Sequence, residues 1–139
     1  MNQPIISIAI DAMGGDRAPN KVIEGCKIFL NNNKNVKLII FGNKNLISKH
    51  FIDKYSEMIS IIHCDEIILD NDKPSSILRS KKESSMRKAI EFIKSKNNIG
   101  FVSAGNTGAV TALSKILLGT LENIKRPAFC SMIPTTKGF

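Results

Sequence analysis

One stretch of the sequence combines glycines with hydrogen-bond donors: residues 103–109, which read SAGNTGA. An apolar run precedes it at residues 99–102, and a helix-like run follows at residues 110–118. A strand that ends in a glycine-rich turn and opens into a helix points free N–H groups and the positive end of the helix dipole beyond the sheet. The side-chain donors and glycines of the stretch are Ser103, Gly105, Asn106, Thr107 and Gly108. Two interpretations are open: an anion site, or an ordinary loop with Asn106 or Thr107 as the helix N-cap.

A second glycine-rich loop follows the first apolar run of the chain. Residues 5–10 are rich in isoleucine and are typical of a buried parallel strand, with Asp11 at its tip and Gly14, Gly15 and Asp16 in the turn beyond it. In open parallel sheets, ligands bind beyond the carboxyl ends of the strands. We therefore expect both loops at the same edge of one sheet. The turn lacks the GxGxxG pattern, so a dinucleotide is not expected, and no cofactor is predicted.

A basic segment lies between the two loops in the sequence. Residues 74–96 predict a short helix that starts at a proline and a second helix capped by the pair Ser84-Ser85. Five basic side chains stand between positions 79 and 88: Arg79, Lys81, Lys82, Arg87 and Lys88. The first turn of a helix disfavours a cation by roughly 0.3–1 kcal/mol, and Arg87 and Lys88 fall in such a turn. A bound anion would offset this cost; the alternative is that these side chains simply extend into water.

Apolar runs and helical periodicity alternate along the whole chain. Strands are predicted at residues 5–10, 36–41, 59–63, 99–102 and 128–133, and helices at residues 19–31, 45–55, 74–78, 85–96 and 108–118. Strands that alternate with helices indicate an α/β fold with a mostly parallel sheet and helices on its faces. At 139 residues with 42% hydrophobic content, the chain is expected to form a single domain, 1–139.

Composition limits the classes of function. No apolar stretch approaches the roughly 20 residues of a membrane span, and no secretory signal is recognisable, so a soluble cytoplasmic protein is expected. The three cysteines are widely spaced and without a CxxC pair, which favours buried reduced thiols over a metal site; no metal is predicted. The net charge of +8 permits several anionic partners. With one tyrosine and no tryptophan there is little for bases to stack on, so nucleic acid is not expected as a partner.

Four motifs in order resemble the signatures of the bacterial phosphate acyltransferase family, a family of fatty acid and phospholipid synthesis proteins. They are IAIDAMGGD (residues 8–16), Pro74-Ser75 with Ser84-Ser85-Met86-Arg87, SAGNTGA (residues 103–109) and Arg126-Pro127-Ala128. The resemblance implies transfer of a long-chain acyl group from acyl carrier protein to inorganic phosphate, which gives acyl phosphate. It also implies a Rossmann-like sheet similar to that of phosphotransacetylases, and a cytoplasmic homodimer that works near the membrane, with peripheral membrane association.

The expected chemistry needs no nucleophile from the enzyme. Phosphate that attacks a thioester must be positioned against the carbonyl, and the developing oxyanion must be stabilised by donors. We assign catalytic roles to Asn106, Arg87 and Asp11. We assign substrate binding to Gly14, Gly15, Asp16, Arg79, Lys82, Ser85, Ser103, Gly105, Thr107 and Gly108. Lys81 and Lys82 are candidates to meet the acidic carrier protein.

The resemblance covers only the amino-terminal part of the family, whose members are more than twice as long as this chain. We therefore expect a truncated form of the family fold. The alternative to an enzyme is a non-catalytic remnant or binding module that retains the phosphate-binding loop.

Overall fold

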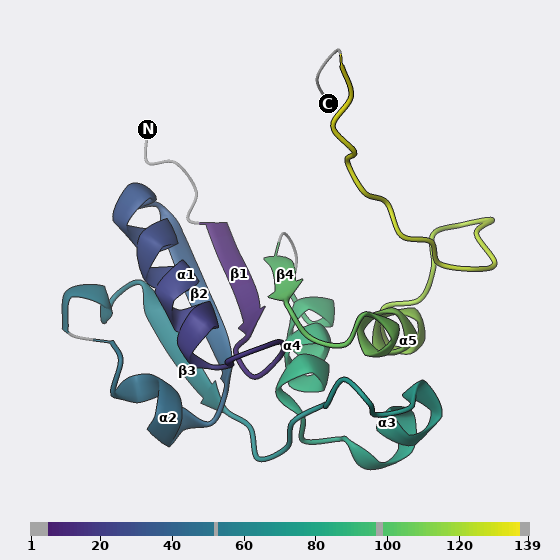
Figure 1. The fold of residues 1–139 in the computed structure, drawn as a ribbon, viewed down its shortest axis with the longest axis horizontal. Helices are drawn as coiled ribbons and strands as arrows, with labels where there is room; N and C mark the ends of the chain where they lie inside the picture. The colour runs from purple at the N-terminus through teal and green to yellow at the C-terminus, as the bar shows by residue number, and fades with distance from the viewer. Residues whose placement is uncertain (1–5, 52, 97–98, 137–139) are drawn as a thin grey trace.

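Four parallel strands form one sheet, in the order β3-β2-β1-β4, within the residues that the computed structural model describes, 6–51, 53–96 and 99–136 (Figure 1). The strands are β1 (Ile6–Asp11), β2 (Val36–Gly42), β3 (Ile59–His63) and β4 (Ile99–Ser103). The chain winds outward from β1 to β3 and then crosses to β4 on the other side of β1. The carboxyl ends of β1 and β4 therefore meet at a switch in strand order, where α/β proteins bind ligands.

The helices connect the strands much as the sequence predicts. They are α1 (Asn20–Asn32), α2 (Lys44–Ser48), α3 (Pro74–Ser80), α4 (Ser85–Lys94) and α5 (Thr107–Leu117), with a 3₁₀ turn η1 (Asp53–Tyr55). The single helix predicted at residues 45–55 is wrong, because α2 ends at Ser48. His50 and Phe51 donate to the carbonyls three residues before them, and these tight bonds close the helix.

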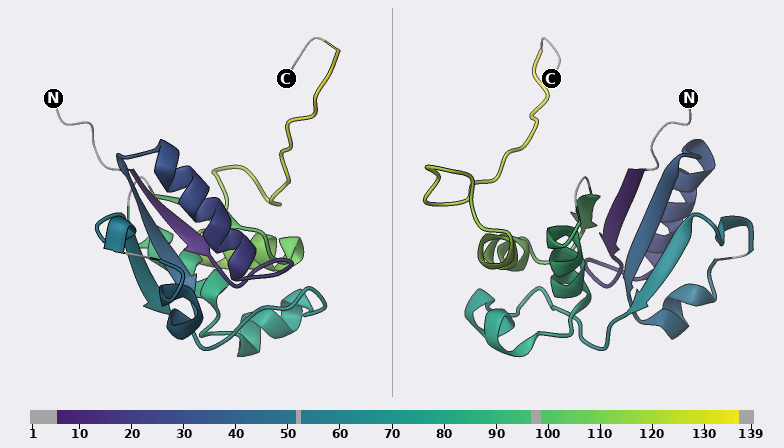
Figure 2. Two further views of the ribbon diagram at one scale, coloured as in Figure 1. Left: turned by 60° about the vertical axis from the view of Figure 1, so that its left-hand side comes forward. Right: turned by 180° about the vertical axis from the view of Figure 1, so that it is seen from behind.

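The two faces of the sheet carry separate cores. On one face, Ile10 and Leu38 pack with Ile23 and Leu30 of α1. On the other face, Ala9, Ile39 and Phe41 pack with Ala89 of α4. Figures 1 and 2 show α1 and α4 on opposite sides of the strands. Alternate residues of β1, β2 and β3 supply the two cores, which confirms the predicted α/β fold with helices on both faces.

The helix α5 packs on α3 and α4 at the side of the sheet. Ala109 and Leu113 are buried there in one cluster with Ile77, Met86 and Ile90. The apolar residues of the segment 109–118 lie over most of a helical circumference, so the sequence predicts burial on most sides of α5, yet Ile116 is 60% exposed. The apolar surface of α5 is therefore covered on one side only among the described residues.

The strand predicted at residues 128–133 is absent. This segment has no regular secondary structure in the described part of the chain, and it extends away from the sheet in Figure 1. A strand is stabilised by hydrogen bonds to a neighbour, and the segment does not lie beside β4. Phe129 is 68% exposed. Cys130 is also exposed, whereas Cys26 and Cys64 are buried, so the prediction of three buried thiols holds for two.

No described helix has both the length and the apolar character that crossing a membrane requires.

Candidate functional site

Asp11 stands at the end of β1 and is 1% exposed. Its Oδ1 accepts the N–H of Met13 at 3.2 Å and the hydroxyl of Ser85 at 2.6 Å, and its Oδ2 accepts the hydroxyl of Ser103 at 2.8 Å. A carboxylate removed from water is stable only where such donors replace its hydration. Asp11 therefore joins three segments: the loop after β1, the start of α4 and the end of β4.

Ser103 extends this network into the second glycine-rich stretch. Its hydroxyl donates to Asp11 and accepts the N–H of Gly105 at 3.1 Å, which bends the chain directly after β4. The register of the sheet pairs Asp11 with Ser103, so the two side chains leave adjacent strands at the same level. The sequence-based expectation that the two loops share one sheet edge is confirmed by this pairing.

The glycines of the first loop allow the two loops to touch. A Cβ on Gly14 would lie 2.7 Å from Oδ2 of Asp11 and 2.8 Å from the backbone nitrogen of Gly105. Gly15 has φ +86°, and a Cβ there would lie 2.6 Å from the carbonyl oxygen of Ala104. No larger residue fits at either position without a shift of the backbone. Gly14 and Gly15 thus hold the loops together at the backbone level.

Asn106 is the N-cap of α5, as one of the two open interpretations predicted. Its Oδ1 accepts the N–H of Ala109 at 2.9 Å. Its Nδ2 donates to the carbonyl of Asp70 at 2.9 Å, with longer contacts to the carbonyls of Leu69 and Asp72. A single side chain therefore caps α5 and holds the loop at 69–72. A direct contact between Asn106 and phosphate stays a prediction.

Arg87 lies on α4, and its described contacts are one within α4 and one with α3. Its Nε donates to Glu91 at 2.9 Å, and its Nη1 donates to the carbonyl of Leu78 in α3 at 3.3 Å. Arg79 and Lys82 are exposed on the surface formed by α3 and the turn after it. A hydrogen bond with Glu83 raises the pKa of Lys88 and keeps it charged. The structure thus gives the basic segment a position beside the loops, with Arg87 already paired.

Asp16, Thr107 and Gly108 complete the predicted set. Asp16 and Thr107 are exposed. A Cβ on Gly108 would lie 3.3 Å from Oδ1 of Asn106 and 3.6 Å from Pro74, so the start of α3 lies against the start of α5. The N–H groups of Ala109 and Val110 are taken by Asn106, while no partner is recorded for the N–H of Thr107 or Gly108 within the described residues. These two groups are donors available to an anion.

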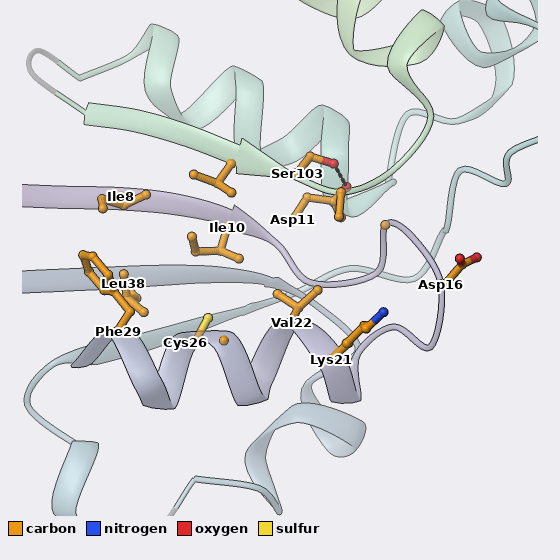
Figure 3. A pocket seen from close by; sticks show the side chains of 14 residues that line it. Ile8, Ile10, Asp11, Asp16, Lys21, Val22, Cys26, Phe29, Leu38 and Ser103 are labelled. Atoms are coloured by element: carbon orange, nitrogen blue, oxygen red, sulfur yellow. Dashed lines mark hydrogen bonds between the residues drawn. The ribbon is translucent and has the colours of Figure 1, made fainter. Parts of the chain in front are cut away.

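A cleft of about 560 Å³ opens beside the loops, between α1 and the strands β1 and β4. Figure 3 shows Asp11, Asp16, Lys21 and Ser103 toward one end and Ile8 and Phe29 toward the other. Its apolar lining consists of Ile8, Ile10, Val22, Cys26, Phe29, Leu38 and Val102. Burial raises the pKa of the Cys26 thiol to about 11, so this group is neutral at pH 7 and adds to the apolar wall.

The amino-acid sequence alone does not reveal this cleft. Apolar residues recur along α1 at three- and four-residue spacing, as at Val22, Cys26 and Phe29, and this periodicity predicts an apolar face. Periodicity does not reveal that part of this face remains uncovered. Lys21 precedes this apolar face on the helix and lines the polar end. Gly25 is one signal in the sequence. A glycine inside a helix costs roughly 0.5–1 kcal/mol relative to alanine, so its presence indicates that the position has a reason to lack a side chain. Gly25 lines the cleft.

Comparison with known proteins gives one consistent result. The sequence model of the family described as "Fatty acid synthesis protein" matches residues 6–139. The phosphate acyltransferase of Ehrlichia canis (strain Jake) is 50% identical over 137 residues, which cover 94% of this chain and 40% of the relative. That of Wolbachia pipientis subsp. Culex pipiens is 47% identical over 142 residues, covering 96% and 41%, respectively. The more distant enzyme of Caldicellulosiruptor saccharolyticus is 38% identical over 135 residues, covering 96% and 40%.

The chain spans about two-fifths of the length of the curated relatives it matches. The match extends across the four parallel strands, both glycine-rich loops and the basic segment between them. The three loops joined at Asp11 and the sequence similarity lead to the same conclusion: this chain belongs to the fatty acid synthesis protein family, whose curated relatives are named phosphate acyltransferases.

Proposed function

We propose that this chain binds phosphate and takes part in transfer of a long-chain acyl group from acyl carrier protein to phosphate, giving acyl phosphate for phospholipid synthesis. The observation that carries the proposal is the network at Asp11, which brings the motif-bearing loops to one sheet edge. The chain spans only part of its relatives, so transfer by this length of chain is itself the quantity to be tested.

The proposed reaction is an attack by a phosphate oxygen on the thioester carbonyl carbon. A C–O bond forms, the C–S bond breaks, and the thiol of the carrier leaves with the proton that hydrogen phosphate gives up. The enzyme needs to hold the anion near the carbonyl and to stabilise the negative charge on the carbonyl oxygen. Donors placed in advance serve both purposes without a covalent intermediate on the protein.

The N–H groups of Thr107 and Gly108, at the start of α5, are the proposed donors to phosphate or to the oxyanion. They stand at the positive end of a helix dipole, which favours an anion. Ser103 and Asp11 are proposed to set the bend that aims them. Asn106 is proposed to fix the first turn of α5, since both ends of its amide already bind the protein.

The basic surface is the proposed contact for the acidic carrier protein. Arg79 and Lys82 are exposed there, and Lys81 lies 3.9 Å from Asp72 at the edge of the loop that Asn106 holds. Arg87 would have to leave Glu91 to meet phosphate, so we propose that it orients α3 against α4 in the free protein. A homodimer and peripheral membrane association stay predictions.

The test compares two substitutions at one position. Proline is tolerated at the first position of a helix and lacks only the N–H group there, so Thr107→Pro removes a proposed donor with little effect on α5. Thr107→Ala removes the hydroxyl and keeps the N–H. Purified chain is mixed with acyl carrier protein thioester and phosphate, and acyl phosphate is trapped with hydroxylamine. We expect product from the wild-type chain and from Thr107→Ala, and at least tenfold less from Thr107→Pro.

A second candidate function is a binding module without catalysis. The side-chain amide of Asn106 and the guanidinium of Arg87, both predicted to be catalytic, already have protein partners, which favours it. This candidate predicts that inorganic phosphate binds to the chain and is released by Thr107→Pro, while no hydroxamate forms with any acyl chain. Equal phosphate affinity of the two variants would contradict both candidates.

A further inference from the structure

The cleft between α1 and β4 is apolar along most of its length and polar at the end that the loops close. Along the strands its wall is apolar, whereas Asp11, Gly14, Ser103 and Ala104 form the end beyond the strand tips. Figure 3 shows this change of character from Ile8 to Ser103. A ligand that fits both parts needs an apolar tail and a polar head.

The cleft exists because α1 covers β1 and β2 more fully than β4. Val102 of β4 pairs with Ile10 in the register, yet Val102 is 54% exposed and Ile10 is 7% exposed. Phe29, one turn from the end of α1, is 36% exposed at the far end of the cleft. Apolar side chains that are this exposed beside a polar mouth form a surface whose burial by another apolar group is favourable.

Gly25 keeps this space open. It follows Val22 by three residues and precedes Phe29 by four, so all three lie on one face of α1. A Cβ at Gly25 would meet no protein atom within 4 Å. The position therefore tolerates a side chain sterically, and any side chain placed there would occupy the cleft.

We infer that the cleft binds the hydrocarbon tail of the acyl substrate, with the thioester or acyl phosphate head at the Ser103–Ala104 end. This inference rests on the proposed function and assigns a place to one part of its substrate. The tail would run along α1 from the Lys21 end toward Phe29, over Ile10 and Ile8 of β1. A longer tail would cover more of this wall, so affinity would rise with chain length until the tail passes Phe29.

The test uses alkyl phosphates as stable probes, from butyl to decyl phosphate, titrated calorimetrically into the purified chain below their micelle concentrations. We expect affinity to rise about two- to fourfold per methylene group. Gly25→Phe should remove this dependence and weaken decyl phosphate at least tenfold, while butyl phosphate binds as before. Ile28→Phe is the matched control, because Ile28 lies on the same helix, is 65% exposed and does not line the cleft.

Three results would overturn the inference: no dependence on chain length, no effect of Gly25→Phe, or a loss of self-association in Gly25→Phe, which would make the cleft an interface between copies. Gly25→Ala guards against misfolding, since it fills less of the cleft and favours the helix. If alkyl phosphates bind with the expected dependence but no hydroxamate forms, the cleft stands and the transfer fails. If the wild-type chain and Gly25→Phe both form hydroxamate equally from short and long acyl chains, the proposed acyl transfer is supported and the assignment of the cleft to the acyl tail is wrong.

Discussion

The hydroxyl of Ser85 donates a hydrogen bond of 2.6 Å to Oδ1 of Asp11, across 74 positions of the sequence. This bond connects the first residue of α4 to the last residue of β1, and Ser103 makes the matching bond to Oδ2 from β4. Both serine hydroxyls donate to the same carboxylate. The position of three loops therefore depends on one buried charge.

Asp11→Asn is expected to destabilise the chain by about 2 kcal/mol, because hydrogen bonds to a charged group are lost and one amide hydrogen faces a donor. Urea denaturation followed by circular dichroism measures the change. Asp16→Asn is the control, since Asp16 is exposed and should change stability by less than about 0.5 kcal/mol. Equal denaturation midpoints for the two variants would refute the structural role of Asp11.

Gly14→Ala and Gly25→Ala should have opposite effects. At Gly14 the new methyl group would lie within 3 Å of Asp11 and Gly105, so a loss of about 1–3 kcal/mol is expected. At Gly25 it meets nothing within 4 Å and lies in a helix, so a gain of about 0.4–1 kcal/mol is expected. Thermal unfolding of both variants gives the sign directly. A stable Gly14→Ala variant would mean that the two loops do not touch.

Two substitutions of Asn106 should separate its two tasks. Asn106→Asp keeps an oxygen to cap α5 but loses the amide donors to the loop at 69–72, whereas Asn106→Ala loses both. The lost cap should cost about 1 kcal/mol. By amide hydrogen exchange, we expect faster exchange at 69–72 in both variants and at the start of α5 only in Asn106→Ala. Faster exchange at α5 in both variants would contradict the cap.

The Cys26 thiol should make stability fall at alkaline pH. Burial raises its pKa from 9.0 to about 11, so the unfolded chain loses the proton at a lower pH than the folded chain. The contribution of the Cys26 thiol to the free energy of unfolding is therefore complete below about pH 9 and is lost as pH rises to about 11. Thermal unfolding between pH 8 and pH 11 tests this, with Cys26→Ala expected to show the shallower decline. Parallel declines would show that Cys26 ionises equally in both states.

Most of the fold could be predicted from local sequence. Apolar runs bounded by turns predicted β1, β2, β3 and β4 within about one residue, because the strands of a parallel sheet have near-continuous apolar sequences. The strand predicted at 128–133 failed for a different reason. Its apolar residues satisfy the same pattern, but a strand also needs a neighbour, and the pattern of one segment contains no information about its partner.

The candidate site was likewise predictable from the sequence in part only. The glycine-rich composition of the two loops predicted their meeting, because strand ends of a parallel sheet share an edge. The sequence did not reveal that Ser85 and Ser103 turn their hydroxyls to Asp11, or that the amide of Asn106 holds carbonyls at 69–72. Those partners come from distant segments and depend on how α4 and the loop at 69–72 pack.

The edge of β4 that faces away from β1 should make the chain self-associate in solution. Among the described residues β4 pairs only with β1, so the N–H and C=O groups along its other side are open to an extended segment. The exposed apolar residues at 128–133 are such a segment, and another molecule can supply it as readily as the same one. Light scattering should therefore report larger species as the chain is concentrated, and dilution should reverse the exchange of segments between molecules.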